Sequence, residues 1–121
     1  MMFLVLEDEP FIAMDLSMAF EDAGHEAATA ATCEEAMDVL ANRHIAGAVL
    51  DVNLGGGQTC EKAAAELDKR GLPFVLHTGD LNRVGELLRD FGAPIIEKPV
   101  PSETVVARLL DLCEENASEN T

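Results

Sequence analysis

The chain has 121 residues, with 8 Lys and Arg against 23 Asp and Glu, so its formal net charge is −15. This acidity argues against nucleic acid as a partner, because binding there begins with Lys and Arg neutralising phosphates. Acidic membrane surfaces are disfavoured for the same reason. Hydrophobic residues make up 48% of the chain, which predicts one folded domain with a real core.

The cysteine pattern and the apolar runs bear on where the protein resides. No apolar run approaches the length of about 20 residues needed to cross a bilayer, and the first residues lack the pattern of a secretory signal. Cys33, Cys60 and Cys113 stand far apart, so they predict neither a disulfide framework nor a zinc site. We interpret them as small buried or half-buried hydrophobes and expect a reducing cytoplasm. The five methionines are expected to fill the core.

Short apolar runs alternate five times with helical patterns along the chain. The runs have the length of strands, and the segments between them repeat apolar residues at the spacing of a helix face. Glycines stand where helices would end, and Thr32 with Glu35 forms a capping box at the start of one helix. The predicted strands cover residues 3–6, 26–30, 45–50, 74–76 and 95–96. The predicted helices cover about 10–23, 32–42, 60–70, 81–91 and 102–113, and the glycines 55–57 form a loop.

This alternation predicts the fold class. A repeated strand–helix unit with apolar strands implies a parallel sheet covered by helices on both faces. Right-handed crossovers then give an α/β, flavodoxin-like (βα)5 doubly wound sheet with strand order 2-1-3-4-5. We expect one domain over residues 1–115 and a polar C-terminal tail over 116–121, with the chain frayed from Glu114 onward.

Polar side chains follow four of the five strands, at the sheet edge where such folds bind ligands. Glu7 and Asp8 follow the first strand, Asp51 closes the third, Thr78 the fourth and Lys98 the fifth. Carboxylates that gather in one cleft need a cation, and oxygen ligands favour Mg²⁺. We expect Asp8 and Asp51 as Mg²⁺ ligands and Glu7 as a ligand through bound water. Lys98 and Thr78 are then placed for a phosphoryl group, which Asp51 would accept as a nucleophile.

With these residues in this order, the chain resembles the receiver domain of two-component response regulators. The resemblance implies that Asp51 accepts phosphate from a sensor histidine kinase or a histidine phosphotransfer protein. It also implies that Asp8 and Asp51 bind Mg²⁺ together with the backbone carbonyl of Asn53. Thr78 would turn toward a phosphoryl oxygen, and Lys98 would pair with the phosphate.

A narrower resemblance rests on the segments that begin at Asp51 and Gly71. They are similar to stand-alone single-domain receivers with the signature Pro-Phe-x-Phe-Ala-Thr-Gly-x-Tyr (FATGUY type), which resemble regulators of alphaproteobacterial stress and cell-cycle signalling. Leu76, His77 and Leu81 stand where that signature has Phe, Ala and Tyr. The match to this subtype is therefore partial.

One further departure from the family pattern bears on mechanism. Many receivers carry Tyr or Phe three residues before the lysine, whereas Ile95 stands there in this chain. The resemblance therefore implies a switch without the usual aromatic residue. We expect the readout in the mobility of segment 81–91, because Gly79 and Gly85 lower its rigidity. His77 has two interpretations, an ordinary polar contact at a strand end or a group that influences the lifetime of the phosphoryl group.

The sequence thus predicts a phosphoacceptor module that signals through protein contact or acts as a phosphate sink, and that is not an enzyme. One alternative is a phosphatase or phosphotransferase that forms an aspartyl phosphate on small molecules. Such enzymes need a second acid where Asn53 stands. A receiver that no longer cycles phosphate is a second alternative, motivated by the missing aromatic residue. A flavin-binding flavodoxin is disfavoured, because the loop after the first strand is acidic.

Overall fold

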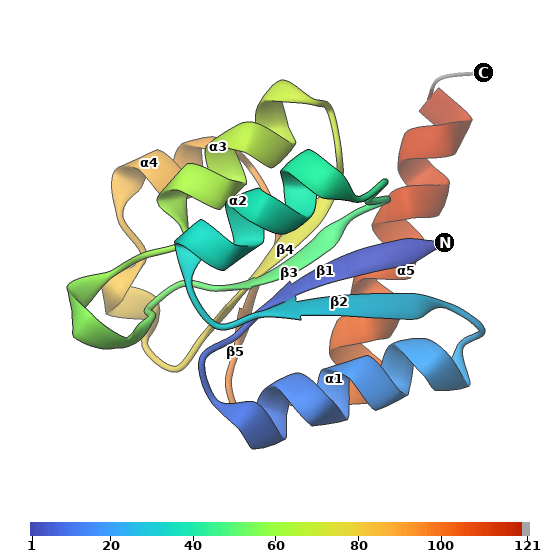
Figure 1. Cartoon of the computed structure of the whole chain (residues 1–121). Coiled ribbons are helices and arrows are strands. Elements are labelled where there is room, and N and C mark those ends of the chain that lie inside the picture. The colour runs from blue at the N-terminus through green and yellow to red at the C-terminus, as the bar shows by residue number, and fades with distance from the viewer. Residues whose placement is uncertain (120–121) are drawn as a thin grey trace.

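The computed structural model describes residues 1–119, with side chains described for residues 1–116. It contains one parallel sheet of five strands in the order β2-β1-β3-β4-β5, so the predicted doubly wound, flavodoxin-like architecture is confirmed. Figure 1 shows the sheet through the middle of the molecule. The strands are β1 (Met2–Leu6), β2 (Glu26–Ala30), β3 (Ala48–Asp51), β4 (Phe74–Thr78) and β5 (Ile95–Glu97).

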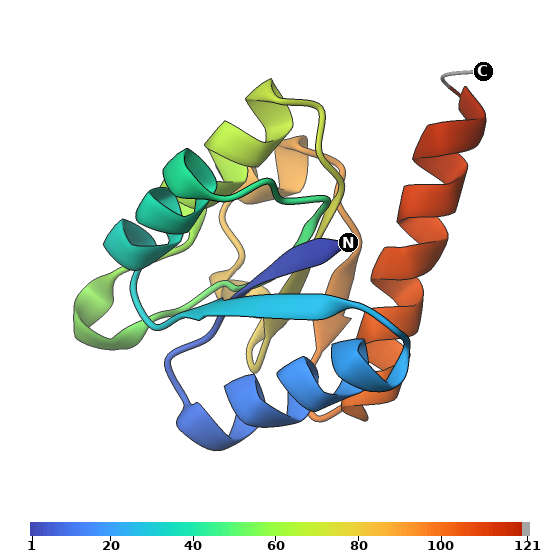
Figure 2. The ribbon, with the colours of Figure 1, turned by 45° about the vertical axis from the view of Figure 1, so that its right-hand side comes forward.

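Helices cover both faces of this sheet (Figures 1 and 2). The helices α1 (Pro10–Asp22) and α5 (Ser102–Glu119) pack on one face. The other face carries α2 (Cys33–Asn42), α3 (Glu61–Lys69) and α4 (Glu86–Asp90). Two short 3₁₀ turns, η1 (Gly55–Gly57) and η2 (Leu81–Arg83), complete the described elements.

A separate hydrophobic cluster fills the space between the sheet and each layer of helices, because the central strands are apolar on both faces. On the α1 side, the rings of Phe3 and Phe20 stack with centroids 4.8 Å apart. Gly47, just before β3, lets the backbone pass close to Pro73 and to the side chains of Phe3 and Leu109 in this core. A Cβ atom there would lie 2.9 Å from the carbonyl oxygen of Pro73, so any larger residue would push the two segments apart.

Two predicted helix boundaries are confirmed in atomic detail. The hydroxyl of Thr32 accepts a hydrogen bond from the backbone N–H of Glu35 at 3.1 Å, as a capping box requires. Gly24 follows α1 with φ at +87°, a left-handed conformation that favours glycine. Local sequence signals therefore set where α2 begins and where α1 ends.

Other predicted boundaries are wrong. The strand predicted from Ile45 begins only at Ala48, although Ile45 is buried, because an apolar run can extend beyond the hydrogen-bonded strand. The helix predicted over residues 81–91 is also not continuous. It is replaced by η2 and by the five-residue helix α4, with extended backbone at Val84 and Gly85 between them.

Local side-chain bonds explain this interruption. The carboxylate of Asp80 accepts from the backbone N–H of Asn82 at 2.9 Å and caps η2. Arg89 of α4 donates to the carbonyl oxygens of Val84 at 3.1 Å and Leu81 at 2.8 Å. These bonds hold the backbone in a shape that a continuous helix would not have.

The end of the chain also differs from expectation. Residues from Glu114 were expected to be frayed, but α5 continues to Glu119. The side chain of Asn116 donates to the carbonyl oxygen of Gly71 at 3.3 Å, which ties this part of the helix to the body of the domain. Residues 120–121 of the predicted tail lie outside the described residues, and the domain boundary after residue 115 stays a prediction.

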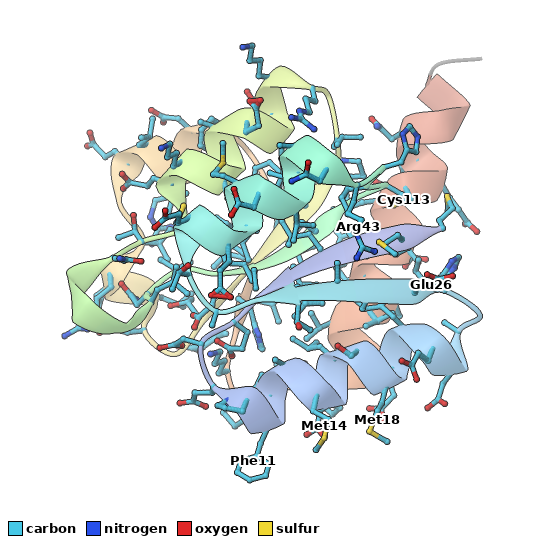
Figure 3. All side chains as sticks on the ribbon, in the orientation of Figure 1. Phe11, Met14, Met18, Glu26, Arg43 and Cys113 are labelled. Atoms are coloured by element: carbon cyan, nitrogen blue, oxygen red, sulfur yellow. The ribbon has the colours of Figure 1, made fainter. Side chains whose placement is uncertain are left out.

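The expectation that the methionines fill the core is wrong for three of the five, because Met1, Met14 and Met18 are each more than half exposed. Met14 and Met18 project from the outer side of α1 next to Phe11, whose side chain is 79% exposed (Figure 3). Helix α1 thus presents apolar residues on its outer face as well as its inner face. The cysteines are buried or half-buried, as predicted. Within residues 1–119, no helix has both the length and the apolar character needed to span a membrane.

Candidate functional site

The register of the central strands places the predicted acids side by side. Leu6 of β1 pairs with Leu50 of β3, so the residues that follow them, Glu7 and Asp51, are neighbours at the carboxyl edge of the sheet. Asp51 pairs in turn with His77 of β4. Residues in register on parallel strands point to the same face, so these three side chains form one row across the sheet.

Three acids meet at this edge, as the sequence predicts. Carboxylate oxygens of Glu7, Asp8 and Asp51 all lie within 4.8 Å of one another. Glu7 and Asp51 are buried, whereas Asp8 is exposed and accepts a hydrogen bond from the backbone N–H of Gly55 at 3.0 Å. A cluster that offers only oxygen ligands suits a hard cation, so these residues could hold a metal ion.

Lys98, which follows β5, supplies a positive charge to the same cluster. Its Nζ lies 2.9 Å from Oε1 of Glu7 and 3.6 Å from Oδ1 of Asp51. Burial alone would lower the pKa of Lys98, but the hydrogen bond to Glu7 and the charges of Asp51 and Glu7 outweigh it and raise the pKa. The side chain of Lys98 therefore stays positively charged at neutral pH. The peptide bond that joins Lys98 to Pro99 is cis.

The acids also act on one another. Burial, followed by hydrogen bonding to Glu7 and by its negative charge, raises the pKa of Asp51 to about 8, although Lys98 opposes the shift. The surroundings of Asp51 therefore favour its protonated form when no cation is bound. A metal ion among the three carboxylates would displace this proton and leave the carboxylate free as a nucleophile.

The two remaining predicted residues have other partners in this structure. Thr78 is buried, and its hydroxyl donates to the carbonyl oxygen of Asp80 and accepts from the backbone N–H of Asp80, both at 3.1 Å. The hydroxyl would have to exchange these bonds to reach a group on Asp51. Asn53 lies after β3, where it forms an isolated antiparallel bridge with Thr59.

His77 is the residue whose importance the sequence left most open. Its side chain is 4% exposed, and burial, followed by the charge of Lys98, lowers the pKa of His77 to about 4. Among the described residues, nothing hydrogen-bonds to its buried Nε2 atom. The expected polar contact at a strand end is thus not found for this atom. The sequence shows only a histidine within an apolar run. It carries no signal that tells whether the ring nitrogen has a hydrogen-bond partner.

Comparisons with known proteins gave no match by sequence but several matches by structure. None of the protein-family models matches this sequence, and neither does any curated protein. Solved structures do match. A CheY-like response regulator receiver domain from Methanospirillum hungatei JF-1 has a TM-score of 0.85 and 22% identity over 98% of this chain and 97% of its own. The N-terminal domain of a response regulator/sensory box/GGDEF three-domain protein from Carboxydothermus hydrogenoformans has a TM-score of 0.87 and 19% identity, with both chains fully covered.

A third match carries ligands. A response regulator protein from Burkholderia pseudomallei, solved with a phosphorylated aspartic acid, a calcium ion and citrate, has a TM-score of 0.79 and 22% identity over 99% of this chain and 72% of its own. Likeness at this level of identity establishes the fold, and the acidic edge described above lies at the carboxyl ends of that fold's strands. The chain has the fold of the CheY-like response regulator receiver domains.

Proposed function

We propose that the chain is a phosphoacceptor receiver of a two-component or phosphorelay system, with Asp51 as the phosphorylated residue. The observation that carries the proposal is a buried Asp51 beside two further carboxylates and a lysine ammonium, at the ligand-binding edge of a receiver fold. The phosphoaspartate in the Burkholderia pseudomallei structure supports the same chemistry.

Asp8 and Asp51, with the backbone carbonyl of Asn53, would hold Mg²⁺, and Glu7 would act through bound water. The ion would neutralise the carboxylates and the phosphoryl oxygens. An oxygen of Asp51 then attacks the phosphorus of a phosphohistidine, the P–N bond breaks, and the imidazole leaves with the electron pair. Lys98 would pair with the transferred phosphate.

The response to phosphorylation would begin at Thr78. A phosphoryl group on Asp51 offers acceptors that compete with Asp80 for the Thr78 hydroxyl. Loss of those bonds would free the turn that leads into η2 and α4. Because Ile95 replaces the usual aromatic residue, we propose that the altered shape of segment 81–91 is itself the signal that a partner protein reads.

The donor would be a sensor histidine kinase or a histidine phosphotransfer protein, and the module would signal through protein contact or serve as a phosphate sink. We propose a signalling role rather than turnover of small molecules, because Asn53 cannot supply the second acid that aspartyl-phosphate phosphatases use. A cytoplasmic location and the FATGUY subtype stay predictions.

Labelling with radioactive acetyl phosphate in the presence of Mg²⁺ tests the proposal. The wild-type chain and the exposed-acid control Asp38→Asn are expected to take up label, whereas Asp51→Asn is expected to take up none. Chelation of Mg²⁺ should abolish labelling of the wild type. Equal labelling of Asp51→Asn would contradict the assignment, and rapid turnover of p-nitrophenyl phosphate would favour the enzyme alternative.

A further inference from the structure

The three acids of the candidate site are not held equally firmly. Glu7 and Asp51 are buried, and the ammonium of Lys98 lies 2.9 Å from Glu7 and 3.6 Å from Asp51. Asp8, in contrast, is exposed. Within residues 1–116, the only hydrogen bond to its carboxylate comes from the backbone N–H of Gly55, which lies 3.0 Å from Oδ2. A single bond from a loop therefore fixes the third acid.

The loop that supplies this bond connects β3 to α3 and projects from the carboxyl edge of the sheet (Figure 1). Its middle residues, Gly56 and Gly57, have φ values of +73° and +77°, left-handed conformations that favour glycine. A Cβ atom on Gly55 would lie 3.3 Å from Oδ2 of Asp8, so the backbone of the loop passes close to this carboxylate. The three glycines thus bring a backbone amide against a predicted metal ligand.

The two divalent cations that prefer oxygen ligands differ in how much they depend on such a bond. Mg²⁺ requires near-ideal octahedral geometry with ligands at about 2.0–2.1 Å, whereas Ca²⁺ accepts more ligands in a flexible geometry. Groups that hydrogen-bond to a metal ligand orient it, and their loss lowers metal affinity by about 10–100-fold. A carboxylate that is free to turn therefore costs Mg²⁺ more affinity than Ca²⁺.

We propose that Gly55 is a positioning residue whose N–H holds Asp8 in one orientation and thereby favours Mg²⁺ over Ca²⁺ at the acidic cluster. The bond acts through Asp8 and needs no contact between Gly55 and the ion. Its role in signalling rests on the proposed phosphoacceptor function, whereas cation binding itself does not and can be measured without a phosphodonor.

The local backbone allows the N–H of Gly55 to be removed by a single substitution. Gly55 does not have a positive φ, unlike Gly56 and Gly57. Leu54 has φ of −94° and ψ of 158°, the extended conformation that a residue before proline adopts. Gly55→Pro therefore removes the donor with little change to the loop. Gly55→Ala is the matched control, because it adds a Cβ atom beside Asp8 but keeps the N–H.

Titration of the ¹⁵N-labelled chain with MgCl₂ or CaCl₂ at constant ionic strength, followed by the amide NMR shift of Asn53, tests the proposal. Gly55→Pro is expected to weaken Mg²⁺ binding about tenfold and Ca²⁺ binding by less than about threefold. Gly55→Ala should weaken the binding of either ion by less than about threefold. Dispersed amide signals show that each variant has kept the fold.

Unchanged Mg²⁺ affinity in Gly55→Pro would overturn the positioning role, and equal losses for the two ions would overturn the preference for Mg²⁺. A wild-type chain that binds no Mg²⁺ would overturn both. If Gly55→Pro does not fold, the Gly55 amide decides the result. Asp8→Ala should shift its proton signal upfield by removing the acceptor, and an unshifted signal would overturn the contact.

Labelling with acetyl phosphate separates this inference from the proposed function. A wild-type chain that shows the expected cation affinities but takes up no label would contradict the phosphoacceptor role and leave the role of Gly55 standing. Labelled wild type with the same Mg²⁺ affinity in Gly55→Pro and Gly55→Ala would do the reverse.

Discussion

The two halves of the candidate site differ in how firmly the fold holds them. The central strands β1 and β3 carry Glu7 and Asp51, both buried and in contact with the same lysine. In contrast, β4 leads into η2 and the five-residue helix α4, which expose Leu81 and Leu87. The acids thus lie in a rigid frame, while the segment after Thr78 has few buried groups to fix it. The proposed phosphoacceptor function would need this combination, because the acceptor must be preorganised and the segment that responds must be able to change.

The largest expected effect tests the rigid frame. Phe20→Ala removes a ring that stacks on Phe3 in the core, so it should lower the free energy of unfolding by about 3–5 kcal/mol. Leu87→Ala in α4, where the side chain is 51% exposed, should change it by less than about 0.5 kcal/mol. Urea unfolding followed by circular dichroism measures both. Equal losses would remove the distinction between the two regions.

The second prediction concerns the raised pKa of Asp51 and its effect on the stability of the folded chain. The pKa of Asp51 is about 8 in the folded chain, against an ordinary value of 3.8 for an aspartate side chain, so the folded state binds this proton more tightly than the unfolded state. The contribution of Asp51 to stability therefore falls as pH rises between these values. Without metal, Asp51→Asn should be more stable than the wild type by about 1–4 kcal/mol at alkaline pH, with the gain vanishing near pH 4. A gain that is the same at both pH values would refute the assigned pKa.

The pH dependence of Mg²⁺ affinity is a smaller expected effect. It also results from the raised pKa of Asp51. Below the pKa of about 8, the ion must displace the proton of Asp51, so its apparent affinity should rise about tenfold per pH unit and level off above that value. The chain has no Trp or Tyr, so calorimetry is the suitable method. A flat pH profile would show that Asp51 is already ionised without the metal. Asp51→Asn should lose the pH dependence.

The smallest expected effect concerns the segment between β4 and α4, which the fold holds less firmly than the central strands. Arg89 is bonded to the carbonyl oxygens of Leu81 and Val84, so Arg89→Ala should loosen only the segment between β4 and α4. Amide hydrogen exchange there should become about fivefold faster, corresponding to about 1 kcal/mol, with global stability unchanged. Arg83→Ala, which removes only an exposed ion pair with Asp80, serves as the control. A global loss of stability would mean that this segment unfolds together with the core.

The sequence patterns correctly predicted the features that depend on the spacing of apolar residues. They failed for features that depend on contacts with residues distant in the sequence or on particular side-chain bonds. The strand order and the meeting of Glu7 with Asp51 follow from alternating apolar runs and their polar ends. The spacing of apolar residues over 81–91 also fits a helix, but the bonds of Arg89 interrupt it, and no periodicity reports such bonds. The partners of His77 depend on residues far away in the sequence, so neither its burial nor its unpaired nitrogen could be predicted.

The exposed apolar strip on α1, formed by Phe11, Met14 and Met18, has a consequence for colloidal behaviour. Such a strip favours contact between molecules, but each molecule carries a net charge of −15. At low ionic strength, long-range repulsion keeps the strips apart, whereas at 0.15 M salt it is screened beyond about 8 Å. Solubility should therefore fall as salt is added, which is opposite to the behaviour of a protein whose molecules attract one another through charge.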